Sequence, residues 1–195
     1  MEAALPTPNA DANEPQKDKV ADAAFDPRAF RHALGQFATG VSIITAMGPD
    51  ENPIGMTMSS FNSLSLDPPL ILFSVDRKSY SLQPMLDAKG YAVNILSRAQ
   101  EHLSNKFARA LSDKFADVEH DLGFAQAPLL RDALAHFECE AYANYDGGDH
   151  VIFVGRVVRF NARTDLDPLL FFRGKYCDLT TEARPAPQWP LPIHY

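Results

Sequence analysis

Two long β-rich runs near the end of the chain constrain its fold most strongly. HFECEAYANY covers residues 136–145 and HVIFVGRVVRF covers residues 150–160, with only DGGD between them. Aromatic and β-branched residues favour strands, and glycines adopt the positive φ angles that tight turns between strands require. The pattern therefore predicts a long antiparallel hairpin over these residues.

Four earlier runs also favour strands: VSIITAM (41–47), IGMTMSSF (54–61), LILFSVD (70–76) and YAVNIL (91–96). The turn-forming stretch GPDENP makes the first two candidate partners in a second hairpin. LILFSVD is continuously apolar, which is typical of a strand buried on both faces, and Pro68 and Pro69 break the chain before it. Because strands outnumber helices and follow one another as hairpins, we expect a mainly β, antiparallel barrel with attached helices rather than a doubly wound parallel sheet.

Three segments are predicted to be helical. The first begins after Asp26, a suitable cap, has Pro27 in its first turn and ends at Gly40. Ser79 is a candidate cap for a short helix in SYSLQPMLDAKG, and Ser97 is one for a helix over residues 98–108. The first helix is also supported by apolar residues that recur at i, i+4 and i+7: Phe30, Leu34 and Phe37.

Composition excludes several classes of protein. The 195 residues are 46% hydrophobic and 22% charged, which is typical of a globular chain, and their formal net charge is -7. That charge argues against a protein that binds nucleic acid by neutralising phosphates. Cys139 and Cys177 show no CxxC motif and no His-rich spacing around them, so we expect neither a disulfide framework nor a structural zinc site.

The two ends of the chain differ from its middle. Residues 1–25 are proline-bearing and poor in apolar side chains, so we expect a disordered or extended tail. Residues 181–195 are rich in proline and are interpreted as an extended arm, which leaves one domain over residues 26–180. The chain contains no signal-like apolar segment at its start and no apolar run of about 18 residues, so we expect a cytoplasmic protein.

GMTMSSFNSLSLDPPL, residues 55–70, carries more hydroxyl groups than a buried strand usually does. Alternation along a strand would leave neither of its faces uniformly apolar. Short side chains allow a flat ligand to approach the backbone, and hydroxyl and backbone groups can then bind its polar edge. On this pattern alone, an edge strand or loop that faces water is the simpler explanation.

DRKSYS, residues 76–81, joins a predicted strand to a predicted helix. Its cations and hydroxyls, together with the free N–H groups of a helix start, form a plausible phosphate cradle. A Ser-capped helix flanked by solvated charges explains the same residues equally well. The chain lacks GxxxxGK[ST] and GxGxxG, so neither ATP hydrolysis nor ordinary dinucleotide binding has support.

Two later motifs also carry polar side chains. His150 follows the Gly-rich turn directly, where a strand can hold it at the rim of a pocket, although a surface histidine at a hairpin end is about as common. FFRGKYCDL, residues 171–179, groups Arg173, Lys175 and Tyr176, which can contact a phosphate and a ring or pack the end of a barrel. Neither GxSxG nor a catalytic-cysteine signature occurs.

The order of these motifs closely resembles the flavin reductase-like domain family over about residues 26–179. The segments that carry the resemblance are FRHALGQFATGVSIITA, GMTMSSFNSLSLDPPLILFSVDRKSYS, YAVNIL, LSNKFA, DKF, GDHVIFVGRV and LLFFRGKY. Members of that family are short NAD(P)H:flavin oxidoreductases that serve two-component flavin-dependent monooxygenases. The resemblance implies a split β-barrel that forms a homodimer and binds FMN or FAD near the subunit interface.

The resemblance also implies roles for individual residues. The residues that would line the flavin ring are Thr57, Met58, Ser59, Ser60 and Ser63. Those that would hold the phosphate end are Asp76, Arg77, Lys78, Ser79 and Ser81. Lys106 and Phe107 stand where the family usually has Arg-Phe, and Lys lacks the planar fork of Arg. The residues that would border the nicotinamide are Gly148, Asp149, His150 and Tyr176, with an orienting or electrostatic role for His150 in catalysis.

The implied activity is hydride transfer from NADH or NADPH to the flavin, followed by delivery of reduced flavin to an oxygenase partner. Because the flavin carries the redox chemistry, this activity requires no acid–base pair from the protein. One alternative is a flavin-binding electron carrier on the same barrel without nicotinamide-dependent turnover. Another, a barrel that oxidises a pyridoxine-type phosphate, matches the GDH motif and the hydroxyl run less well.

Overall fold

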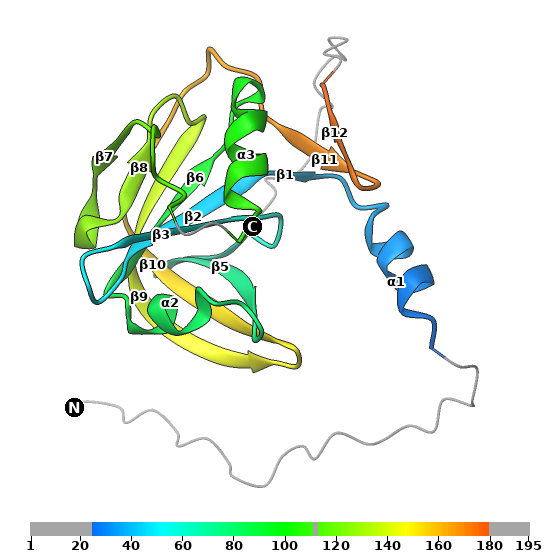
Figure 1. Ribbon diagram of the computed structural model, residues 1–195, viewed down its shortest axis with the longest axis horizontal. Helices are drawn as coiled ribbons and strands as arrows, with labels where there is room; N and C mark the ends of the chain where they lie inside the picture. The colour runs from blue at the N-terminus through cyan, green and yellow to red at the C-terminus, as the bar shows by residue number, and fades with distance from the viewer. Residues whose placement is uncertain (1–24, 111–112, 180–195) are drawn as a thin grey trace, which may run out of the picture.

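Seven antiparallel strands form the main sheet of the computed structural model (Figure 1). Their spatial order is β3 (Pro53–Met58), β2 (Ser42–Met47), β6 (Gly90–Ile95), β9 (Ala135–Gly147), β10 (His150–Ala162), β5 (Pro69–Asp76) and β4 (Asn62–Leu66). The structure describes residues 25–110 and 113–179. The predicted tail, apart from Phe25, and the predicted C-terminal arm therefore lie outside the described residues.

Small sheets and short helices surround the main sheet. One small sheet consists of β1 (Thr39–Gly40), β11 (Leu170–Phe172) and β12 (Lys175–Cys177), and another of β7 (His120–Leu122) and β8 (Pro128–Leu130). The helices are α1 (Pro27–Leu34), α2 (Leu82–Asp87) and α3 (Glu101–Phe107), with 3-10 turns η1 (Arg98–Gln100) and η2 (Phe124–Gln126). The expectation of a mainly β, antiparallel chain with attached helices is confirmed. Among the described residues, no helix is long and apolar enough to cross a membrane.

Both predicted hairpins are present. β2 pairs antiparallel with β3, from Ser42 opposite Met58 to Met47 opposite Pro53. β9 pairs with β10, and His150 lies opposite Gly147, so that Gly148 and Asp149 form a two-residue loop. Gly148 has a φ of 76°, as expected for a glycine at the first position of such a loop.

Two predictions for the middle of the chain were wrong. The hydroxyl-rich run is not one strand, because β3 ends at Met58 and β4 begins only at Asn62. β5 is not buried on both faces, since its buried residues alternate with more exposed ones: Ile71, Phe73 and Val75. In an antiparallel sheet with one face toward the core, only every second side chain points inward.

The helix predictions were right in position and wrong in detail. Asp26 caps α1, with its Oδ1 accepting a hydrogen bond of 2.8 Å from the backbone N–H of Arg28, but the helix ends at Leu34 and not at Gly40. α2 begins after Ser81 and not after Ser79. The apolar residues of this segment are exposed within this chain: Phe30, Leu34 and Phe37 are 49%, 58% and 73% exposed. Figure 1 shows why, since α1 lies beside the body of the sheet and not upon it.

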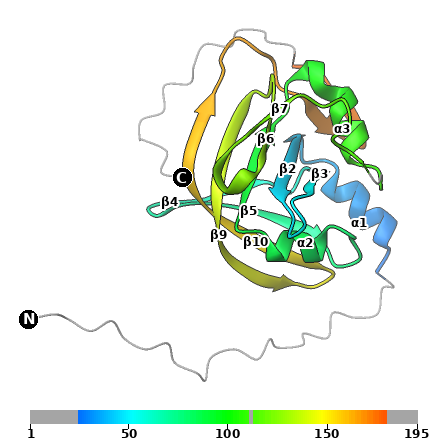
Figure 2. The ribbon, with the colours of Figure 1, turned by 60° about the vertical axis from the view of Figure 1, so that its left-hand side comes forward.

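The main sheet curves around one hydrophobic core (Figure 2). Strands from both halves of the sheet contribute buried residues to it, including Ile44, Phe73, Tyr91, Cys139 and Phe153. Cys139 is buried, and burial raises the pKa of its thiol to about 12. The curvature brings the end of edge strand β3 to β5, where the Ser60 Oγ donates to the Ser74 carbonyl at 3.3 Å and accepts from its N–H at 3.1 Å.

A buried asparagine joins β6 to its neighbours. Asn94 Nδ2 donates to the carbonyl of Ile43 at 3.0 Å and to Thr45 Oγ1 at 3.1 Å, and Asn94 Oδ1 accepts from the N–H of Leu130 at 2.8 Å. The Asn94 side chain is fully buried. Its removal would therefore leave polar groups of β2 and β8 without partners and away from water.

We predict that Asn94→Ala lowers the free energy of unfolding by about 2–3 kcal/mol, because buried polar groups lose their hydrogen bonds. Urea denaturation measures this change. The control is Asn144→Ala on the same sheet, where the side chain is exposed and the expected change is within about 0.5 kcal/mol. Equal losses in the two variants would show that the Asn94 network does not stabilise the fold.

Candidate functional site

A pocket of about 470 Å³ opens between β3, the segment before α2 and the C-terminal end of α3. This volume lies in the range of sites that bind small molecules. The lining combines apolar, hydroxyl and cationic side chains: Met56, Thr57, Ser79, Tyr80, Ser81, Phe107, Ala108, Arg109, Ala110 and Lys114. Of the twelve residues predicted to bind the cofactor, the pocket brings together Thr57, Ser79, Ser81 and Phe107.

α3 forms one wall of the pocket because it packs directly on β3. A Cβ atom on Gly55 would lie 2.6 Å from the Phe107 ring, so only glycine permits this close approach. Thr57 Oγ1 also donates to the Ser104 carbonyl at 2.7 Å. The Phe107 ring is buried and meets Phe115 edge-on, with 5.0 Å between the ring centroids. These contacts fix the aromatic wall relative to β3.

Lys114 places a positive charge in the pocket wall. Its Nζ donates to the carbonyl oxygens of Gly55 at 3.0 Å and Phe107 at 2.9 Å. Partial burial lowers the pKa of Lys114 from the ordinary value of 10.5. Lys114 had no role in the sequence-based prediction, although it belongs to the DKF motif, and neither did Arg109, Met56 or Tyr80.

Lys106 points to a different partner. Its Nζ donates to the carbonyl of Ala116, and the residue is absent from the pocket lining. The predicted cation of the Lys106–Phe107 pair therefore lies outside the pocket, while the aromatic residue of the pair lines it.

The other residues predicted to bind the ring lie in several places. Ser60 holds the end of β3 to Ser74, and Met58 packs against the core. Ser59 is exposed. Ser63 lines a separate, mainly apolar groove of about 320 Å³ between β4, β5, β9 and β10, together with Phe137 and Phe160.

The residues predicted to hold a phosphate divide into two groups. Ser79 and Ser81 line the pocket, with Ser79 Oγ accepting from the N–H of Ser81 at 3.2 Å. Asp76, Arg77 and Lys78 are exposed and absent from its lining. Asp76 Oδ1 accepts from the N–H of Lys78 at 2.7 Å. The Arg77 side chain reaches the β9–β10 hairpin instead.

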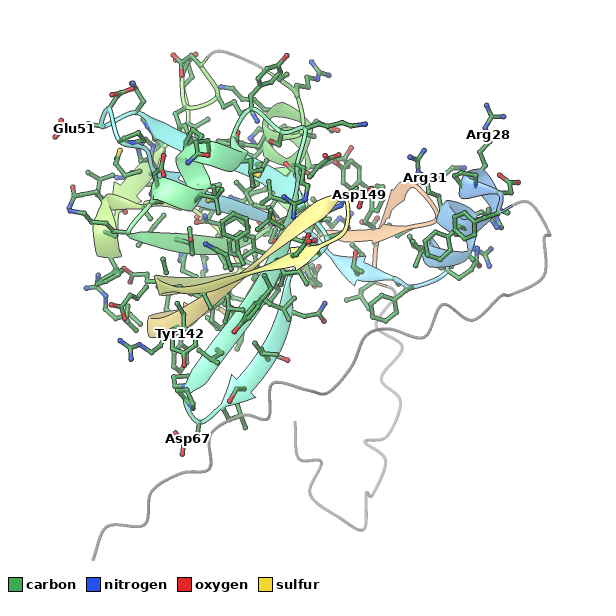
Figure 3. All side chains as sticks on the ribbon, turned by 90° about the horizontal axis from the view of Figure 1, so that it is seen from below. Arg28, Arg31, Glu51, Asp67, Tyr142 and Asp149 are labelled. Atoms are coloured by element: carbon green, nitrogen blue, oxygen red, sulfur yellow. The ribbon has the colours of Figure 1, made fainter. Side chains whose placement is uncertain are left out.

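His150 lies beside the pocket-lining segment. It is paired with Asp76 in the register of β10 and β5, three residues before Ser79. Its Nδ1 lies 2.7 Å from Asp149 Oδ1, and this hydrogen bond with His150, together with the charge of the imidazole, lowers the pKa of the Asp149 carboxyl. Figure 3 shows Asp149 at the tip of the hairpin. Gly148 precedes it in the loop.

Tyr176 is connected to the pocket wall through Ser104 of α3. Its Oη lies 2.8 Å from the Oγ of buried Ser104, the residue whose carbonyl accepts from Thr57. In the part of the chain that the structure describes, no hydrogen bond joins His150 to Tyr176. Within the same residues, no three His, Cys, Asp or Glu side chains gather as metal ligands would.

The family model described as "Flavin reductase like domain" matches residues 34–180. The chain belongs to this family. A "Probable flavin reductase" from Rhizobium meliloti (strain 1021) is 45% identical over 152 residues, which are 78% of this chain and 49% of that relative. This chain thus spans about half the length of that flavin reductase.

Two further members of the flavin reductase family resemble the chain over most of their own length. The reductase subunit HsaB of a flavin-dependent monooxygenase from Rhodococcus jostii (strain RHA1) is 39% identical over 169 residues, 86% of each chain. The solved structure of the NADH:FAD oxidoreductase SgcE6 from Streptomyces globisporus, in complex with NAD and FAD fragments, has 36% identity and a TM-score of 0.77. It matches over 82% of this chain and 96% of that one.

Proposed function

We propose that this protein is an NAD(P)H-dependent flavin reductase that transfers hydride from NADH or NADPH to FMN or FAD and supplies reduced flavin to a partner monooxygenase. One observation carries the proposal: in a chain of the flavin reductase family, one pocket joins an aromatic wall to hydroxyl and cationic groups. The names of the HsaB and SgcE6 relatives support the oxygenase partner and the two cofactors, respectively.

The residues of the pocket suit a phosphate-bearing flavin. Met56 and Phe107 offer apolar and aromatic surface to a flat ring, and the hydroxyls of Ser79 and Ser81 can donate to phosphate oxygens. Lys114 adds a positive charge to the same pocket. The chemistry of this donor set therefore fits the cofactor that the family uses.

Bound flavin supplies the acceptor for the hydride of the nicotinamide. The protein holds and shields the flavin. Phe107 and Met56 exclude water from one side of the flavin, and Thr57 is fixed by its hydrogen bond to Ser104. Lys114, anchored by two carbonyl oxygens, provides a fixed positive charge that favours negative charge on the ligand. His150 donates through Nδ1 to Asp149 and keeps Nε2 available to orient the nicotinamide.

The alternative of a flavin-binding electron carrier requires the same pocket but no site for a nicotinamide. The Asp149–His150 pair beside the pocket favours the reductase, because a carrier has no need of a polar group placed there.

We also propose a cytoplasmic location, where NADH and NADPH are available. Recovery of the protein in the cell envelope on fractionation would contradict this location.

We further propose that the main sheet is a split β-barrel that works as a homodimer. The curvature of the sheet and the Ser60–Ser74 hydrogen bonds between opposite parts of it support the barrel. The apolar face of α1 supports the dimer, because Phe30, Leu34 and Phe37 are exposed in the single chain. A second copy is the natural cover for this face.

We predict that the purified protein oxidises NADH or NADPH only when FMN or FAD is added or retained, because the flavin is the hydride acceptor. The loss of absorbance at 340 nm, measured with two flavins and two nicotinamides in all four combinations, tests this. A background rate in all four would refute the reductase. Retained flavin without NAD(P)H oxidation would select the electron carrier.

We predict that Lys114→Met weakens FMN binding by about tenfold or more, because a charge-assisted hydrogen bond in the pocket is lost. Lys106→Met is the matched control, since it removes the same charge eight residues earlier on the outside of the pocket and should change the dissociation constant by less than about threefold. Quenching of flavin fluorescence measures both. An equal or larger effect of Lys106→Met would mean that the phosphate lies elsewhere.

We predict a dimer in solution that the double variant Phe30→Glu/Leu34→Glu converts to monomer, because two charges would be buried in the interface. Light scattering after size exclusion measures the mass. Leu122→Glu, at a residue 54% exposed on β7, is the control and should remain dimeric. A monomeric native protein would refute the dimer, and a dimeric double variant would exclude α1 from its interface.

A further inference from the structure

The loop that carries Asp149 receives little support from side chains packed around it. Gly148 and Asp149 are its only two residues, between the ends of β9 and β10. A Cβ atom on Gly148 would meet no described atom within 4 Å, so the loop is open at this point. The pairing of β10 with β5 ends at His150, opposite Asp76, so another contact must connect the two loop residues to β5.

Arg77 supplies that connection from the end of β5. Its backbone N–H donates to the Asp149 carbonyl at 3.0 Å, and its Nε donates to the Gly148 carbonyl at 2.9 Å. Its Nη2 pairs with the carboxylate of Asp146, and this hydrogen bond with Arg77 lowers the pKa of that carboxyl. One residue thus bonds both loop residues and the strand that leads into them.

These contacts compete with the phosphate role that the family resemblance implies for Arg77. A guanidinium bonded to a carbonyl and a carboxylate has fewer free donors for an anion. The pocket lining includes Ser79, Ser81, Arg109 and Lys114 but not Arg77. The cations of the pocket are therefore supplied by residues after α3, and the Arg77 side chain is directed at the hairpin.

We infer that Arg77 is a positioning residue for the hydride donor: it clamps the Gly148–Asp149 loop and thereby orients the side chain of His150, whose backbone the pairing with β5 already holds. The inference rests on the proposed reductase function, because it assigns His150 to the nicotinamide. The clamp acts through Asp149, whose carboxylate bonds His150 Nδ1 at 2.7 Å. His150 is also the register partner of Asp76, the residue before Arg77.

The clamp fixes the position of the hairpin tip and contributes little to the stability of the fold. The side chains of Arg77 and Asp146 are 46% and 80% exposed, and exposed ion pairs stabilise a fold only weakly. Loss of the clamp should therefore leave the melting temperature unchanged while it loosens the tip of the hairpin. The binding of a ligand that contacts His150 should weaken, and the binding of flavin in the neighbouring pocket should not.

Three variants of the full chain test this: Arg77→Ala, Asp146→Asn and the double variant. We expect KM for the nicotinamide to rise about fivefold in both single variants, with the dissociation constant of FMN changed less than about twofold. The double variant should be no worse than Arg77→Ala, because Arg77→Ala already removes the pairing with Asp146. Amide hydrogen exchange of residues 146–150 should become faster in all three.

Arg156→Ala is the matched control. Arg156 also pairs with a carboxylate of the β9–β10 hairpin, that of Glu140, and its side chain is 48% exposed. It lies six residues along β10 from His150, so the nicotinamide KM should not change. If KM for the nicotinamide rose as much as in Arg77→Ala, the loss of any ion pair on the hairpin would have this effect. That result would overturn the proposal that Arg77 is a clamp.

A phosphate role for Arg77 gives the opposite result. Arg77→Ala would then weaken the binding of FMN but not that of riboflavin, which has no phosphate. It would leave the hydrogen exchange of the loop unchanged, and Asp146→Asn would not raise KM for the nicotinamide. Calorimetric titration with NADH and with NADPH separates this failure from failure of the reductase proposal. If the native protein binds NADH or NADPH without turnover, the fold-change in the dissociation constant of that nicotinamide replaces KM. If it binds neither nicotinamide, both proposals fall.

Discussion

The curvature of the seven-stranded sheet determines where the pocket forms. β3 and β5 are separated in the sheet by β2, β6, β9 and β10, yet the Ser60 hydroxyl bonds the backbone of Ser74. Because the chain after β3 crosses to β5 in this way, Met56 and Thr57 of β3 line one pocket with the segment that follows β5. A flat sheet of the same strands would hold these two groups of pocket residues far apart.

α3 and Lys114 complete the pocket on the side that the sheet leaves open. Gly55 lets the Phe107 ring touch β3, and Lys114 bonds carbonyl oxygens of both elements. Ser104 connects this wall to the small sheet, since its carbonyl accepts from Thr57 and its hydroxyl bonds Tyr176. The wall is therefore fixed from both sides, while His150 lies opposite Asp76, at the end of β5 that leads to Ser79 and Ser81.

Local patterns were sufficient to predict much of the fold. The hairpin around Gly148 and the cap at Asp26 follow from turn chemistry and capping, and both are present. The break of the hydroxyl-rich run after Met58 does not follow from local pattern, because Ser60 is held by β5, which is separated from β3 by four strands of the sheet. The exposure of the apolar side chains of α1 is likewise invisible to periodicity, which predicts an apolar face but not its partner.

The site was harder to predict than the fold for a related reason. The sequence of DRKSYS suggests a single phosphate site. In the structure, however, Ser79 and Ser81 line the pocket, while the Arg77 side chain bonds the β9–β10 hairpin. Lys106 and Lys114 have the same side chain and lie close in sequence, yet only Lys114 lines the pocket. Which cation reaches the site depends on the direction of each side chain in three dimensions, and the sequence spacing of these two lysines does not encode that direction.

A crystal structure of the protein grown with FMN tests the central claim most directly, namely that the pocket between β3, the segment before α2 and α3 is the flavin site. We expect the ring against Met56 and Phe107 and the phosphate at Ser79, Ser81 and Lys114. Flavin in the groove lined by Phe137 and Phe160, or bound with its phosphate on Arg77 and away from Lys114, would contradict the assignment of the site.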